Sequence, residues 1–169
     1  MERLQRRNPS RPLISQAQNN TTLWIGHPEH DTRDHIAGQT FIASASGQLD
    51  NIQVYSSLVQ HPGDVELTLH EFDPFTKSWG APIAHASLPL SHNDGNTWIR
   101  FDLPTVHITQ GRSYGFRLET RNALIALGEA ARGMKEPFSF GHEWSADSVD
   151  RKGHYFSYFS LAFKVELCA

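Results

Sequence analysis

Apolar and polar residues alternate over most of the chain after residue 38. In the segment 64–72, "DVELTLHEF", Val65, Leu67 and Leu69 are separated by single polar residues. A period of two is typical of a β-strand with one face on a hydrophobic core and the other in water. The pattern therefore predicts a strand here with one solvated face.

The same alternation predicts further strands, at residues 41–43, 52–54, 83–90, 99–103, 114–118 and 159–165. The Ser46-Gly47 and Asp94-Gly95 pairs between them are turn signals, since glycine and aspartate tolerate positive φ. Helical propensity occurs only over 122–134, where Gly128 and Gly133 interrupt it. We predict a strand over Leu124–Leu127, with a helical turn near Glu129–Arg132 as the alternative.

Short strands spaced about ten residues apart and separated by turn formers are typical of all-β sandwiches and barrels. We predict an antiparallel two-sheet β-sandwich, a jelly roll. A chain of 169 residues suits a single domain. Residues 1–15 hold arginines and prolines without apolar periodicity, so we expect a flexible N-terminal arm followed by one domain over 16–169.

The charge distribution argues against two classes of partner. The net charge is −3 and no long run of one sign occurs, which leaves no electrostatic footprint for nucleic acid. No apolar stretch has the length of a membrane span or follows the basic start as a signal-peptide core. We predict no nucleic-acid partner and no membrane insertion. Cys168, the single cysteine, has no internal disulfide partner and is not expected to be catalytic.

Several segments together resemble a known class of module. They are "AGQTFIASASGQLDNIQVYSS", "GDVELTLHEFD", "PIAHASLPL", "NTWIRFDLPTVHITQGRSYGFRLE" and "FSLAFKVEL", which span roughly residues 38–167. Their order is similar to that of bacterial jelly-roll accessory modules, related in architecture to galactose-binding-like and carbohydrate-binding domains. The resemblance implies a non-catalytic binding or spacer domain located outside the cell or at its surface.

The segment 27–35, "HPEHDTRDH", is the strongest candidate for metal chemistry. Its histidines lack the spacing of a helical zinc motif, and Pro28 opposes a helix. A calcium site formed by Asp31, Asp34 and backbone carbonyls is the better metal hypothesis, since hard oxygen ligands suit a loop. The alternative is a solvated loop that leads into the first core strand.

A cupin-like metal enzyme is a further alternative, because "QHPGDVELTLHEFD" offers His61, His70 and Glu71. Cupin-type sites usually place two histidines one residue apart on one strand face, and these histidines are not so spaced. No nucleophile elbow or phosphate-binding glycine loop occurs. We therefore predict that the protein is not an enzyme.

Aromatic side chains provide the candidate binding surface. All four tryptophans, Trp24 among them, fall in predicted loops or on strand faces opposite the core. Sugar rings stack on aromatic rings and need polar partners for their hydroxyls. The predicted ligand-binding residues are Trp79, Trp98, Arg100, Asp102, His142 and Trp144. We expect a non-catalytic module that binds carbohydrate or another surface ligand such as a protein; the alternative is a structural or assembly domain of a larger surface or fibre protein.

Overall fold

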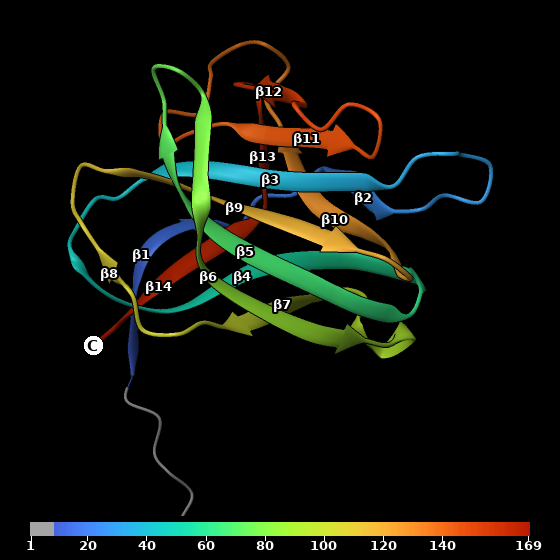
Figure 1. Ribbon diagram of the computed structural model, residues 1–169, viewed down its shortest axis with the longest axis horizontal. Helices are drawn as coiled ribbons and strands as arrows, with labels where there is room; N and C mark the ends of the chain where they lie inside the picture. Colours follow the sequence, from blue (N-terminus) through green and yellow to red (C-terminus); the bar gives the residue numbers. More distant parts are fainter. Residues whose placement is uncertain (1–8) are drawn as a thin grey trace, which may run out of the picture.

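The computed structural model describes residues 9–169, which are 63% β-strand and contain no α-helix (Figure 1). The strands are β1 Ser10–Gln16, β2 Thr21–Gly26, β3 His35–Ile42, β4 Gly47–His61, β5 Gly63–Asp73, β6 Ser78–Leu90, β7 Thr97–Asp102, β8 His107–Ile108, β9 Ser113–Thr120, β10 Leu124–Ala131, β11 Glu143–Asp147, β12 His154–Phe156, β13 Phe159–Leu161 and β14 Phe163–Cys168. A single 3-10 turn, η1, covers His92–Asp94. Within the described chain, no helix is long and apolar enough to cross a membrane.

All strand pairs are antiparallel, and together they form one continuous sheet. Its main path runs β1-β14-β4-β10-β2-β3-β9-β5-β6; β7 and β8 pair with β4, β11 with β3, β12 with β11, and β13 with β10. The sheet curls around the core like an open half-barrel (Figure 1). The all-β antiparallel prediction is thus confirmed, whereas the two-sheet jelly roll is not, because hydrogen bonds connect the strands without a break.

The alternating residues form the core as expected. In β5, Val65, Leu67 and Leu69 are buried, and the facing strand β9 buries Phe116 and Leu118. Each such side chain contributes roughly 1.5–3 kcal/mol when it is fully removed from water. This shared core holds the loops at the sheet edges in fixed positions.

The N-terminal arm is shorter than predicted. Ser10–Gln16 forms β1, which pairs with β14, and Leu13 lies in the core. The Gln16 side-chain amide donates a hydrogen bond to the Leu161 carbonyl at 3.2 Å. Only Leu13 and Gln16 of β1 are buried, so this strand shows no alternation of apolar and polar residues in the sequence. The expectation of an arm up to residue 15 is therefore wrong for residues 10–15, and residues 1–8 lie outside the described part.

The segment of helical propensity is a strand. Leu124–Leu127 is extended as predicted, and β10 continues to Ala131, so the alternative helical turn is wrong. β10 lies between β2 and β4, and its end pairs with β13. Because neighbours on both sides satisfy its backbone groups, this position overrides the helical propensity.

Candidate functional site

The histidine-rich segment is the loop between β2 and β3. Gly26 ends β2 with a φ of 103° and approaches the Ala123 carbonyl so closely that a Cβ would lie 2.0 Å from its oxygen. Glycine is therefore required at this turn. β2 and β3 pair through a single residue pair, Gly26 with His35. The loop between them therefore projects beyond the edge of the sheet (Figure 1).

Two histidine–aspartate pairs hold this loop. His27 Nδ1 lies 2.9 Å from Asp34 Oδ1, and His35 Nε2 lies 2.7 Å from Asp31 Oδ2. The backbone amide of Arg33 also donates to Asp31. The hydrogen bond from His35, followed by that from Arg33, lowers the pKa of the Asp31 carboxyl. Asp31 is thus an acceptor that stays ionised.

The same contacts separate the two residues of the calcium hypothesis. Asp31 and Asp34 bind different imidazoles, so their carboxylates are not directed at one point. Within residues 9–169, no group of three or more histidine, cysteine, aspartate or glutamate residues is placed to hold a metal ion. The structure gives the calcium hypothesis no support.

The loop overhangs a groove along β2, which we call the β2 groove. Its volume is about 700 Å³, and its lining residues are Thr22, Leu23, Trp24, Pro28, Glu29, His30, Asp31, His35, Gln60 and Leu124. The lining combines an indole ring and apolar side chains with carboxylate, imidazole and amide groups. Such a mixture is typical of a small-ligand site, in which a few polar groups fix the orientation of the ligand.

Trp24 differs from the other three tryptophans. Its neighbours Leu23 and Ile25 face the core, so its half-buried ring lies on the outer face of β2. In the described part of the chain, it is the tryptophan whose ring has no aromatic or cationic partner, and its indole N–H makes no hydrogen bond. The Trp24 ring is therefore available to a ligand.

Trp79 and Trp144 form a different cluster. Their ring centroids lie 5.3 Å apart, and the Arg117 guanidinium lies 4.2 Å from one ring and 4.4 Å from the other. Trp144 is 1% exposed and donates through Nε1 to the Lys152 carbonyl. The structure corrects the expectation that Trp144 presents its ring to a ligand, because Trp79 and Arg117 cover it. Trp79 is itself half-buried in this cluster.

The remaining predicted ligand residues lie elsewhere. Trp98, Arg100 and Asp102 share the outer face of β7, as their alternation predicts. Arg100 pairs with Asp102 and with Asp50, both at 2.8 Å. His142 accepts or donates a hydrogen bond with a serine hydroxyl, and burial lowers the pKa of its imidazole. The structure therefore does not bring the six predicted residues together in one site.

The residues of the cupin-like alternative do not converge either. His70 uses both ring nitrogens, with Thr68 Oγ1 and the Gly80 carbonyl at 2.8 Å each, and burial lowers its pKa. His61 is exposed at the end of β4, and Glu71 is exposed on β5 beside Arg112. These groups offer no metal site in common.

A buried pair of carboxyl groups was not predicted from the sequence. Glu129 on β10 and Glu143 on β11 are 5% and 2% exposed, and their carboxyl groups act on each other's pKa. Burial, with a further contribution from Glu129, raises the pKa of Glu143 to about 10, and burial also raises that of Glu129. Glu143 Oε1 has no hydrogen-bond partner. The signal was present, since Glu129 occupies an inward position of an otherwise apolar strand.

No protein-family model matches this chain, and no curated protein matches its sequence. The functional interpretation therefore depends on the β2 groove itself.

Proposed function

We propose that this protein is a non-catalytic carbohydrate-binding module and that the β2 groove is its binding site. The observation that carries the proposal is Trp24, whose unpartnered ring lines the groove. The apolar C–H face of a sugar ring stacks on an indole, and Glu29, Asp31 and Gln60 supply partners for its hydroxyls.

The state of the acids supports binding rather than catalysis. Asp31 is held with a lowered pKa, which suits a hydrogen-bond acceptor, whereas the acid that cleaves a glycosidic bond needs a raised pKa. The Glu129–Glu143 pair does have a raised pKa, but both carboxyls are buried and neither lines the groove. A bound sugar therefore meets no poised proton donor from that pair.

The proposal extends to the fold and the location. The two parts of the curled sheet meet at β2 and β3 through the single pair Gly26 and His35. Because this junction is so short, it supports describing the fold as a flattened jelly-roll sandwich, as in the accessory modules that the sequence resembles. An extracellular or cell-surface location would accompany that assignment.

Replacing Trp24 by alanine is expected to weaken glycan binding by about tenfold or more, because the stacking surface is lost. The measurement is a glycan array to find ligands, followed by titration calorimetry on the wild type and on Trp24→Ala. Phe75→Ala is the matched control, since Phe75 is 96% exposed and lies outside the groove. This control should bind like the wild type.

Two results would overturn the proposal. The first is equal glycan affinity for the wild type and Trp24→Ala. The second is the absence of binding to any glycan at millimolar concentration. A defined oligomer in light scattering, together with that second result, would favour the structural or assembly domain instead.

A further inference from the structure

Glu29 occupies a turn that the β2–β3 loop places beside the β2 groove. The backbone amide of Asp31 donates to the Pro28 carbonyl at 3.0 Å, so Glu29 and His30 are the two central residues of a closed β-turn. The two hydrogen bonds that the Asp31 carboxylate accepts tie the end of this turn to the residues that follow it. Glu29 therefore lines the groove from a backbone position that the loop itself fixes.

The Glu29 carboxylate is free, whereas that of Asp31 is not. One oxygen of Asp31 accepts from His35 Nε2 at 2.7 Å, and the other accepts from the backbone amide of Arg33 at 3.0 Å. Glu29 is exposed, and within residues 9–169 its side chain makes no hydrogen bond or ion pair. Of the two carboxylates in the groove, Glu29 is thus the one with both oxygens available to a ligand.

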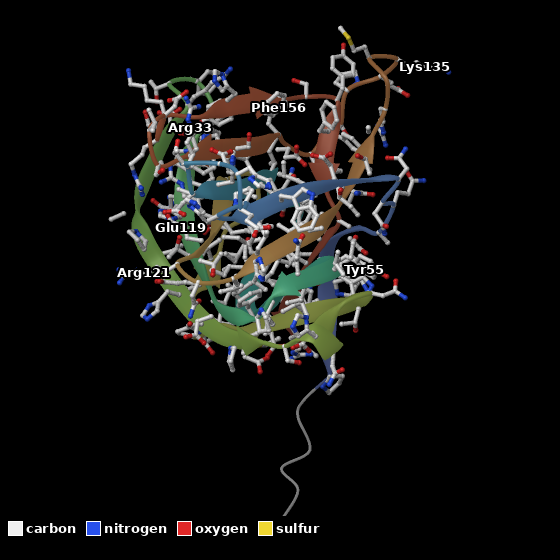
Figure 2. All side chains as sticks on the ribbon, turned by 90° about the vertical axis from the view of Figure 1, so that its right-hand side faces the viewer. Arg33, Tyr55, Glu119, Arg121, Lys135 and Phe156 are labelled. Carbon is white, nitrogen blue, oxygen red and sulfur yellow. The ribbon has the colours of Figure 1, made fainter. Side chains whose placement is uncertain are left out.

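The fixed charges of the groove have one sign. In the described part of the chain, its lining includes the acids Glu29 and Asp31 and no lysine or arginine. Arg33, the arginine of the same loop, pairs with an aspartate of β11 at 3.3 Å. Figure 2 views the molecule from the side on which the loop projects, and Arg33, Arg121 and Lys135 lie towards the edges of that face. An ionic group of a ligand in the groove therefore meets carboxylates first.

Such a groove treats the hydroxyl and the acidic groups of sugars in opposite ways. A hydroxyl donates a charge-assisted hydrogen bond to a carboxylate, and this type of bond is about twice as strong as one between neutral groups. A uronic acid or a sulfate ester instead brings a second negative charge close to the first, and the repulsion grows where the ligand excludes water. The face of the Trp24 ring carries negative charge density and acts in the same direction.

We infer that Glu29 is the specificity-determining residue of the β2 groove and makes it select non-acidic glycans over acidic ones. This inference rests on the proposed function, because it assigns a ligand class to the same groove. In this arrangement Trp24 supplies stacking that is common to many sugars, and Glu29 decides which of them stay bound.

The test is titration calorimetry at pH 8, where histidine side chains add no positive charge to the groove. The probes are the tightest neutral ligand of the glycan array and the same glycan with a 6-hydroxyl oxidised to a carboxylate. The wild type is expected to bind the neutral form at least about fivefold more tightly. Salt at about 1 M should narrow this ratio, because it shortens the screening length to about 3 Å.

Two substitutions of Glu29 separate its charge from the shape of the groove. Glu29→Gln should weaken the neutral ligand by about threefold and reduce the neutral-to-acidic ratio by at least about threefold. Glu29→Lys should bind the acidic form at least as tightly as the neutral form. Glu66→Gln is the matched control, since it removes the same charge from an exposed position outside the groove. This control should keep the wild-type ratio.

The outcomes distinguish this inference from the function on which it rests. An acidic glycan as the tightest ligand of the array overturns the inference alone, provided that its binding depends on Trp24. A neutral-to-acidic ratio that neither substitution of Glu29 changes does the same. Binding that is absent, or unaffected by Trp24→Ala, overturns the proposed function as well.

Discussion

Replacing Glu143 by glutamine is expected to make the protein more stable at pH 8 and to flatten the pH dependence of its free energy of unfolding. In the folded protein, burial and the neighbouring Glu129 raise the pKa of Glu143 to about 10, from an ordinary value of 4.5. The folded state therefore keeps a proton that the unfolded chain releases. A glutamine amide has nearly the same shape, is uncharged at every pH and offers N–H donors to the Glu129 carboxyl.

The sign of the effect follows from proton linkage. Because the folded state binds the proton more tightly, its stability is greatest below about pH 4.5 and falls as the pH rises towards 10. The slope for one such group is at most ~1.4 kcal/mol per pH unit. Glutamine removes this dependence, so the variant should exceed the wild type by on the order of 2 kcal/mol at pH 8.

Urea unfolding at several pH values between 5 and 9 measures this difference. Glu66→Gln is the matched control, since Glu66 is an exposed acid on β5 and loses the same charge. Its stability curve should run parallel to that of the wild type. Parallel curves for the wild type and Glu143→Gln would show that the buried pair does not bind an extra proton.

The strands were predictable because their signal is local. Val65, Leu67 and Leu69 alternate within a single segment, and their burial follows from that pattern alone. The way in which the strands join was not predictable, since it depends on pairing between distant segments. Glu143, for example, pairs with Gln39, and this contact attaches β11 to β3. Only such long-range pairs distinguish one curled sheet from two separate sheets.

The candidate site was predictable in part. The segment "HPEHDTRDH" is predicted as a loop before a core strand, and that loop does overhang the groove. Trp24 was not among the predicted ligand-binding residues, because the availability of a ring depends on which other side chains cover it. Trp144 has polar neighbours in the sequence, yet Trp79 reaches it across Gly38 and Gly115, which have no side chains to keep it away. Coverage of this kind is a property of the folded chain.

Replacing Trp144 by alanine is expected to destabilise the protein by about 3–5 kcal/mol, because a buried ring is lost and leaves a cavity. The loss also removes one of the two rings that contact the Arg117 guanidinium, whose Nε is buried without a hydrogen-bond partner and whose pKa burial already lowers. A cation that loses such cover at a half-buried position becomes more costly to keep there. Urea unfolding at neutral pH measures the change.

Trp24→Ala is the matched control for this prediction, since it removes the same side chain from the half-exposed groove and should cost less than about 1.5 kcal/mol. The order of the two variants should reverse for glycan affinity, in which Trp24→Ala should show the larger loss. Folded Trp144→Ala should keep its glycan affinity, whereas Trp24→Ala should lose it while remaining stable. Equal destabilisation by the two substitutions would contradict the burial of Trp144. Loss of glycan binding in folded Trp144→Ala, with Trp24→Ala binding like the wild type, would contradict the assignment of the ligand to the β2 groove.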